Sequence, residues 1–372
     1  MRKAAFLNRS ITRDRIIKGL IILCSGVILT GAVIAMKKEA VKITNPGNID
    51  IFLIDKDICT VLITDEEIFA GGATGLFSMK SKNPYIKGSS AESNYEENSV
   101  YKDDGYETSE IGRLRYVRDI EKYKERILIA YDEGILVYEN GSLEKFEGSQ
   151  HLPDKRVNEL FVDSSGYLWA GTWGGVVVFD GEKPIKTYSS DDGIAADMVN
   201  KIFEDTHGNI WLGSYVAPDG GVSILYNKEK NIRISVFTVK KGLLHANIND
   251  IILIDDSHVL AGGGLYNRGG VTKFEHDGQN WNIDGYIQKA DGIAGEKVRS
   301  LMLDSKSNLW LGSEYDGLAV YNINEGIENI KILTEEDGLV HNEIKVMKED
   351  SSGDIWIGTL KGLVKIKKGE FK

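Results

Sequence analysis

Residues 157–180 read VNELFVDSSGYLWAGTWGGVVVFD, a pattern of short apolar runs separated by two Gly-containing turns. Six further stretches align with it, at 58–79, 113–139, 199–227, 248–275, 298–322 and 344–366. The Trp of the pattern recurs as Trp169, Trp211, Trp310 and Trp356, and is replaced by Phe69, Leu128 and Leu260 in the other copies. Successive copies are 41 to 59 residues apart, which is typical of β-propeller blades and too long for leucine-rich repeats.

A further apolar run follows each copy except the last, so one unit supplies four short strands, the content of one propeller blade. Seven units predict an all-β, seven-bladed β-propeller at residues 49–372, although the repeat also allows six or eight blades. The last copy lacks its fourth run, whereas residues 49–54 form an apolar run ahead of the first copy. We therefore expect residues 49–54 to complete the last blade, because an unfinished blade would leave an open sheet edge.

The composition favours a β protein with many turns and argues against nucleic-acid binding. The chain has 41 Gly, 5 Pro and 42% hydrophobic residues, with a net charge of −11. Residues 1–38 carry eight basic side chains against one acidic side chain, so the remainder is more acidic still. Nucleic-acid phosphates are bound by clustered Lys and Arg, which an acidic domain lacks. Cys24 and Cys59 lie in different regions, and no disulfide is expected.

The N-terminal region predicts a single membrane-spanning helix. Residues 19–36 contain no charge, and this length is about the minimum for crossing a bilayer. The basic segment 1–18 should remain in the cytoplasm, so the linker 37–48 and the propeller should lie outside it. The alternative is a signal peptide cleaved near Val33-Ile34-Ala35, which would give a secreted propeller.

Residues 81–112 interrupt the repeat. They are acidic, rich in Ser, Gly, Asn and Tyr, and poor in aliphatic residues. Such a composition buries too little apolar surface to order itself, so we expect a flexible insertion between the first and second blades.

The repeats resemble those of the two-component-regulator propeller family. Those repeats combine an Asp-x-x-Gly turn, an Ile/Leu-Trp-Leu-Gly-Thr/Ser group and a trailing Asp-Gly-Leu, found here at 192–194, 291–293 and 337–339 with conservative changes. The match is strong over roughly 150–366 and weaker over 58–149. The resemblance implies an extracytoplasmic sensor propeller, often fused to a histidine kinase and often recognising carbohydrate. Because this sequence ends at its last blade, we expect signalling through the N-terminal helix or a separate sensor kinase.

Turns on one face of the propeller carry the candidate binding residues. The turn between strands two and three and the crossover into the next blade share this face. Turn tips favour small polar residues, so aromatic side chains there are unusual, and beside carboxylates they suit a sugar or a flat apolar ligand. The predicted ligand-binding residues are Tyr131, Trp173, Tyr215, Tyr266, Tyr315, His245, His341 and Glu343. In contrast, the repeated Trp and the Asp-x-x-Gly turns are expected to serve packing and turn formation.

Three functions follow from this pattern. The first is a membrane-anchored propeller that binds a small molecule or glycan and works with a sensor kinase or an envelope protein. The second is a lyase or hydrolase that uses His245, His341, Glu296 and Glu343. The third is a scaffold for assembling envelope proteins. The sequence has no Gly-x-Ser-x-Gly or His-Glu-x-x-His motif, so we favour binding over catalysis and assign no catalytic residue, metal or cofactor.

Overall fold

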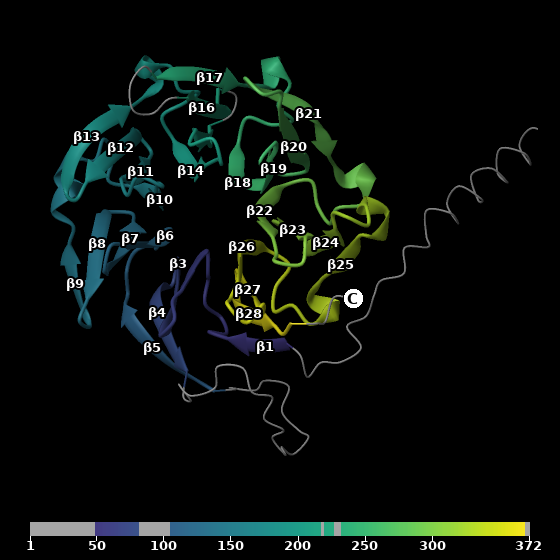
Figure 1. The fold of residues 1–372 in the computed structure, drawn as a ribbon. Coiled ribbons are helices and arrows are strands. Elements are labelled where there is room, and N and C mark those ends of the chain that lie inside the picture. Colours follow the sequence, from purple (N-terminus) through teal and green to yellow (C-terminus); the bar gives the residue numbers. More distant parts are fainter. Residues whose placement is uncertain (1–48, 82–104, 217–218, 227–231, 369–372) are drawn as a thin grey trace, which may run out of the picture. The chain divides into compact units, whose positions relative to one another are not determined.

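The computed structural model describes residues 49–81, 105–216, 219–226 and 232–368. They form seven four-stranded antiparallel sheets arranged as the blades of a ring (Figure 1). The prediction of an all-β, seven-bladed propeller is confirmed. The predicted segments 1–18, 19–36 and 37–48 lie outside the described residues. Among the residues that are described, no helix has the length and apolar character needed to span a bilayer.

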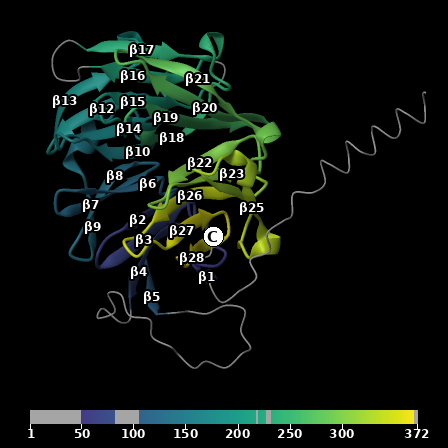
Figure 2. The ribbon, with the colours of Figure 1, turned by 45° about the vertical axis from the view of Figure 1, so that its right-hand side comes forward.

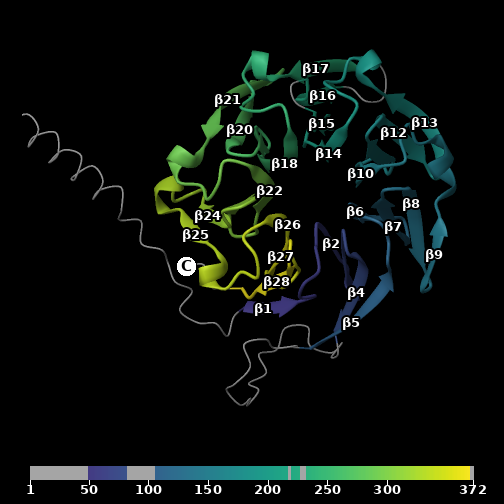
Figure 3. The ribbon, with the colours of Figure 1, turned by 180° about the vertical axis from the view of Figure 1, so that it is seen from behind.

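The blades follow one another along the chain, and each begins with its innermost strand (Figures 1 and 3). Blades 1 to 3 contain β2 (Thr60–Ile63), β3 (Glu67–Gly72), β4 (Gly75–Ser81) and β5 (Tyr106–Gly112); β6 (Asp119–Tyr123), β7 (Arg126–Tyr131), β8 (Gly134–Glu139) and β9 (Ser142–Lys145); β10 (Val157–Val162), β11 (Leu168–Thr172), β12 (Gly175–Asp180) and β13 (Lys183–Tyr188). Blades 4 to 6 contain β14 (Val199–Glu204), β15 (Ile210–Ser214), β16 (Val222–Tyr226) and β17 (Arg233–Phe237); β18 (Ile248–Asp255), β19 (His258–Leu265), β20 (Arg268–His276) and β21 (Trp281–Ile287); β22 (Val298–Leu303), β23 (Asn308–Ser313), β24 (Leu318–Asn322) and β25 (Lys331–Leu333). Blade 7 contains β26 (Ile344–Glu349), β27 (Ile355–Thr359) and β28 (Gly362–Ile366).

The N-terminal strand closes the ring. β1 (Ile49–Phe52) pairs antiparallel with β28, in a register that runs from Ile49 opposite Ile366 to Phe52 opposite Leu363. The turned view shows β1 on the outer side of blade 7 (Figure 2). The Phe52 ring also stacks on the Trp356 ring, with centroids 5.5 Å apart. The prediction that residues 49–54 complete the last blade is therefore confirmed.

The insertion predicted at 81–112 between blades 1 and 2 lies instead within blade 1, between β4 and β5, and it is shorter than predicted. Residues 106–112 form β5, the outer strand of blade 1, which pairs with β4. Most side chains of β5 are exposed, so its apolar content did not indicate a strand. Backbone hydrogen bonding to β4 stabilises β5 as the fourth strand of the blade. Residues 82–104 lie outside the described residues.

Each Asp-x-x-Gly-type turn is joined to the repeated Trp of its own blade. In blades 3, 4, 6 and 7 the indole N–H donates to a carboxylate oxygen six residues earlier, at 2.9–3.0 Å. The pairs are Asp163 with Trp169, Asp205 with Trp211, Asp304 with Trp310, and Asp350 with Trp356. The second oxygen accepts backbone N–H groups of the turn, so each carboxylate has its acceptors occupied. The four Trp side chains are buried, which agrees with their expected packing role.

The Gly that follows Trp-Leu lets neighbouring blades approach. A Cβ atom at Gly213 would lie 2.7 Å from Cγ2 of Ile248 in blade 5, and one at Gly312 would lie 2.6 Å from Cγ2 of Ile344 in blade 7. Real Cβ atoms do not reach such distances, so a larger residue would push the blades apart. The apolar core accordingly lies between adjacent blades, as in the cluster that joins Trp169 to Ile202.

The trailing Asp-Gly-Leu motif shapes the crossovers. Short 3₁₀ turns lie at η2 (Glu147–His151), η3 (Ser190–Asp192), η4 (Val239–Lys241), η5 (Lys289–Asp291), η6 (Ile327–Asn329) and η7 (Glu335–Asp337). At η3 the Asp192 carboxylate accepts the N–H and O–H of Ser189. Gly193 follows with a φ of 97°, which only Gly adopts without strain, and Ile194 then enters the core.

Candidate functional site

The turns between second and third strands share one face with the crossovers. The backbone N–H of Trp173 donates to the Arg156 carbonyl at 3.2 Å, and that of Tyr215 donates to Met198 at 2.9 Å. In blade 6, the N–H of Glu314 donates to the Lys297 carbonyl at 3.2 Å. Each bond ties the turn of a blade to the crossover that enters the same blade. We call this face the rim, and it carries all eight residues predicted from the sequence.

Two of the predicted tyrosines are well exposed on the rim. Tyr266 is 71% exposed and Tyr315 is 54% exposed. The Tyr315 hydroxyl donates to Oε1 of Glu314 at 2.9 Å, and Glu314 also pairs with the Lys297 ammonium. Lys297 in turn donates to the Tyr215 hydroxyl at 3.4 Å, so a polar chain runs from blade 4 to blade 6. Although burial opposes it, the contact with Lys297 lowers the pKa of Glu314, which remains anionic.

Tyr131 and Trp173 are more enclosed. Tyr131 packs against the apolar cluster between blades 1 and 2, and burial raises the pKa of its hydroxyl. The Arg156 guanidinium lies 3.8 Å from the Trp173 ring centroid, and the indole N–H donates to Asn158 at 3.0 Å. Arg118 lies 5.9 Å from the same ring. These contacts occupy surface of Trp173 that a ligand would otherwise use.

His245 and His341 occupy the same position in two different blades. Nδ1 of His245 accepts the backbone N–H of Asn247 at 3.0 Å, and Nδ1 of His341 accepts that of Glu343 at 2.9 Å. Each imidazole therefore stabilises the backbone of its crossover by a hydrogen bond from the residue two positions later. Burial, with help from the positive charges of Arg268 and Lys297, lowers the pKa of His245. A neutral imidazole is consistent with this acceptor role.

Glu343 belongs to an arc of alternating charges across blades 6, 7 and 1. It accepts from Arg299 at 2.7 Å and lies 3.5 Å from the Lys345 ammonium. Arg299 also approaches Glu314, and Lys345 pairs with Asp57 at 2.7 Å. The arc links the last blade to the segment that enters the first blade, through the pair of Lys345 and Asp57.

Inside the ring, a cavity of about 840 Å³ occupies the central channel. Because side chains alternate along a strand, two residues of each inner strand face it. The first ring, nearer the rim, is Thr60, Asp119, Glu159, Lys201, Asp250, Ser300 and Val346. The second ring, which pairs with the repeated Trp position, is Leu62, Glu121, Phe161, Phe203, Ile252, Met302 and Lys348.

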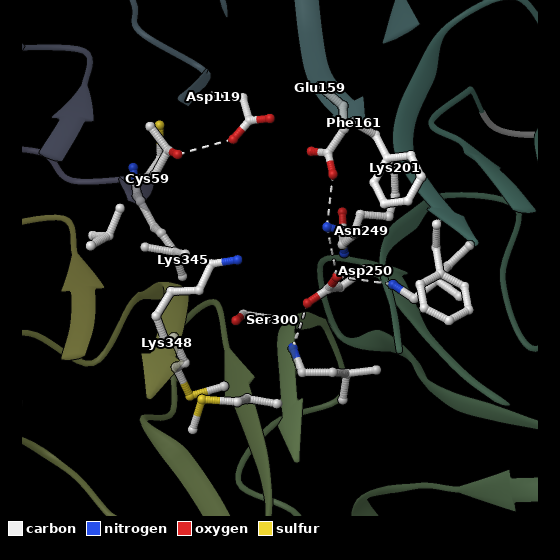
Figure 4. Close-up of a pocket in the computed structure, with 18 of the residues that line it drawn as sticks. Cys59, Asp119, Glu159, Phe161, Lys201, Asn249, Asp250, Ser300, Lys345 and Lys348 are labelled. Carbon is white, nitrogen blue, oxygen red and sulfur yellow. Dashed lines mark hydrogen bonds and ion pairs between the residues drawn. The ribbon is translucent and has the colours of Figure 1, made fainter. Parts of the chain in front are cut away.

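The charges of the first ring are used by the fold. The Lys201 ammonium lies 2.8 Å from Glu159 and 3.5 Å from Asp250. Figure 4 shows Lys201 between these two acidic side chains. Asp119 accepts the backbone N–H of Leu160 in the next blade at 2.8 Å. Burial raises the pKa of Glu159 to about 8, although the Lys201 charge opposes the shift. The ring thus links blades and leaves an excess of carboxylates over cations.

The second ring is apolar except at two positions. Glu121 in β6 and Lys348 in β26 stand on either side of Leu62 in blade 1. Within the described part of the chain, neither side chain forms an ion pair with another side chain. Burial, with a contribution from Asp119, raises the pKa of Glu121 to about 7. Cys59, also at the channel, is a free thiol whose pKa burial raises to about 12.

The channel was not predicted from the sequence, and none of the eight predicted rim residues lines it. The sequence does contain a sign of the two channel charges, because Glu121 and Lys348 stand at a position where the five other copies have an apolar residue. Reading it required the strand register, which fixes the face to which each residue points. Over the described residues, no group of three His, Cys, Asp or Glu side chains is placed to hold a metal ion. The arrangement offers hydrogen bonding, ion pairing and apolar contact.

Comparison with known proteins agrees with the repeat pattern. Residues 151–174 and 338–361 match the model of the two component regulator propeller family. No curated protein matches the sequence.

Solved structures share the fold at low sequence identity. The extracellular domain of a hybrid two component system from B. thetaiotaomicron aligns with a TM-score of 0.66 and 16% identity, over 87% of this chain and 41% of that one. The extracellular domain of a one component system from the same organism gives 0.63 and 17%, over 87% and 40%. Virginiamycin B lyase from Staphylococcus aureus gives 0.59 and 10%, over 88% and 98%. The chain thus spans about two fifths of the sensor domains that it matches, and these likenesses show the fold.

Proposed function

We propose that this chain is a sensing propeller that binds its ligand outside the cytoplasm, because residues 151–174 and 338–361 match the two component regulator propeller family. The family match and the likeness to extracellular sensor domains support sensing as the role. Residues 19–36 would anchor the chain as a single membrane-spanning helix. A separate sensor kinase or envelope protein would then receive the signal.

The rim over blades 4 to 6 is the proposed ligand site. The single observation that carries this proposal is the exposure of Tyr266 and Tyr315 beside a polar chain of Lys297, Glu314 and Tyr215. Exposed aromatic rings present flat apolar faces, and the adjacent carboxylate and ammonium accept and donate hydrogen bonds. This combination suits a carbohydrate, whose rings carry apolar C–H faces between hydroxyl groups.

Glycan binding by rim variants tests the proposal. Tyr266→Ala and Tyr315→Ala should each remove binding to a glycan captured by the native protein on an array, while thermal stability stays unchanged. Ile185→Ala is the control, because Ile185 is 48% exposed but lies on the outer strand β13 of blade 3. Retained binding in the Tyr266→Ala, Tyr315→Ala double variant would reject the rim as the site.

A further inference from the structure

The second ring of the channel carries two charged side chains that form neither an ion pair nor a side-chain hydrogen bond with another described side chain. The carboxylate of Glu121 and the ammonium of Lys348 both line the cavity. Leu62 lies between them on blade 1, while Phe161 and Phe203 line the cavity from blades 3 and 4. The wall thus combines one anion, one cation and an aromatic surface.

These charges contrast with those of the first ring. Lys201 there already contacts Glu159 and Asp250, and Asp119 accepts the hydroxyl of Thr60 at 3.1 Å as well as a backbone N–H. First-ring groups therefore hold neighbouring blades together. Glu121 and Lys348 form no comparable inter-blade hydrogen bond or ion pair within the described residues, although the Lys348 charge reaches Glu121 across blade 1.

We propose that the channel binds a small zwitterion with an apolar side chain, namely a free amino acid or a short peptide. Its ammonium group would lie beside Glu121 and its carboxylate beside Lys348. Its side chain would contact Phe161 and Phe203. This site is separate from the rim, so the proposal goes beyond the function proposed above.

The other ligand classes fit the channel less well. Small-molecule sites typically measure about 300–1,000 Å³, and the cavity of about 840 Å³ lies within that range. A sugar would leave many hydroxyl groups against the apolar residues of the second ring, at a cost for each unpaired group. A phosphate would meet the carboxylates of Asp119 and Asp250. A simple amine would leave Lys348 without a counter-charge.

The protonation of Glu121 supplies an independent readout. Asp119 on the same strand raises the pKa of this carboxyl, whereas Lys348 of β26 and Lys201 of β14 lower it, and burial outweighs them to give about 7. A bound ammonium favours the ionised carboxylate. Binding near neutral pH should therefore release protons, which calorimetry detects as a dependence of the binding heat on the ionisation enthalpy of the buffer.

Calorimetry on the full chain provides the test. Phenylalanine, leucine and a Leu-Phe dipeptide are compared with N-acetyl-phenylalanine, which lacks the ammonium, and with phenethylamine, which lacks the carboxylate. We expect a zwitterion to bind at least ~10-fold more tightly than either derivative. Comparison of the amino acids with the dipeptide shows which size of zwitterion the channel prefers. Glu121→Gln should abolish the preference over N-acetyl-phenylalanine, and Lys348→Met should abolish the preference over phenethylamine.

Tyr266→Ala is the matched control, because it alters the rim and should leave amino-acid binding unchanged. Circular dichroism confirms that the variants fold. No binding of any zwitterion at millimolar concentration, or equal binding of the acetylated derivative, would overturn the proposal. Loss of binding in Tyr266→Ala would instead place the ligand on the rim.

Discussion

The Asp205 carboxylate joins two blades, and a double-mutant cycle measures the strength of that link. The residue is 4% exposed, and its Oδ2 accepts the indole N–H of Trp211 in its own blade at 2.9 Å. The same oxygen accepts the indole N–H of Trp281, which lies in the outer strand of the next blade, also at 2.9 Å. Oδ1 accepts the backbone N–H groups of His207 and Asn209.

Trp281→Phe removes one hydrogen bond to a charged group and keeps an aromatic ring in the packing position. Such a bond contributes about 1.5–3 kcal/mol, so with a packing loss of about 1 kcal/mol we expect the free energy of unfolding to fall by about 2.5–4 kcal/mol. Asp205→Asn should lower the free energy of unfolding by about 3–5 kcal/mol. The amide has one acceptor oxygen, which cannot serve both indole N–H groups and the backbone donors that the two carboxylate oxygens serve. The double variant should cost less than the sum by about 1.5–3 kcal/mol, since the shared bond is lost only once.

Urea unfolding followed by far-ultraviolet circular dichroism gives these energies. Asp163→Asn is the control partner, because the Asp163 carboxylate bonds Trp169 of its own blade. Its combination with Trp281→Phe should be additive within about 0.5 kcal/mol. A coupling below about 0.5 kcal/mol between Asp205 and Trp281 would refute the inter-blade hydrogen bond as a source of stability.

Three further predictions follow from the fold and the two candidate surfaces. Phe52→Ala should lower the free energy of unfolding by about 3–5 kcal/mol, because the buried phenyl ring stacks on Trp356 in the blade that closes the propeller. Urea unfolding measures this loss. The folded pKa of Glu121, about 7, is raised above its unfolded value, so its neutral form stabilises the fold at low pH and this contribution is lost as pH rises from about 4.5 through 7. Glu121→Gln should therefore match the native protein at pH 4.5 and exceed it by about 1–3 kcal/mol at pH 8 in parallel unfolding curves, and the opposite trend would contradict the burial argument. Tyr266→Ala and Tyr315→Ala should change the unfolding free energy by less than about 0.5 kcal/mol, because both rings are mostly exposed; a larger loss would show that they pack on the rim.

Part of the candidate site could be predicted from the sequence. Placing aromatic residues at the turns between second and third strands required only strand order, because antiparallel strands send alternate turns to opposite faces. The exposure of each ring could not be predicted in this way. Arg156 covers Trp173, and Lys297 reaches the hydroxyl of Tyr215 from 82 residues along the chain. The assignment of the eight rim residues to ligand binding remains a prediction.

The sequence by itself determined the propeller fold, the closing strand and the packing role of the repeated Trp, and it favoured seven blades, which the structure confirms. These features depend on local patterns that every copy carries, and repetition makes a weak local pattern specific. The tertiary structure alone decided which side chains enter the channel and which charges there form no ion pair among the residues that the structure describes. The physical reason is that Glu121 and Lys348 meet the same cavity only when seven strands from distant parts of the chain surround one axis. The residue spacing within one repeat does not predict that these two side chains line the same cavity.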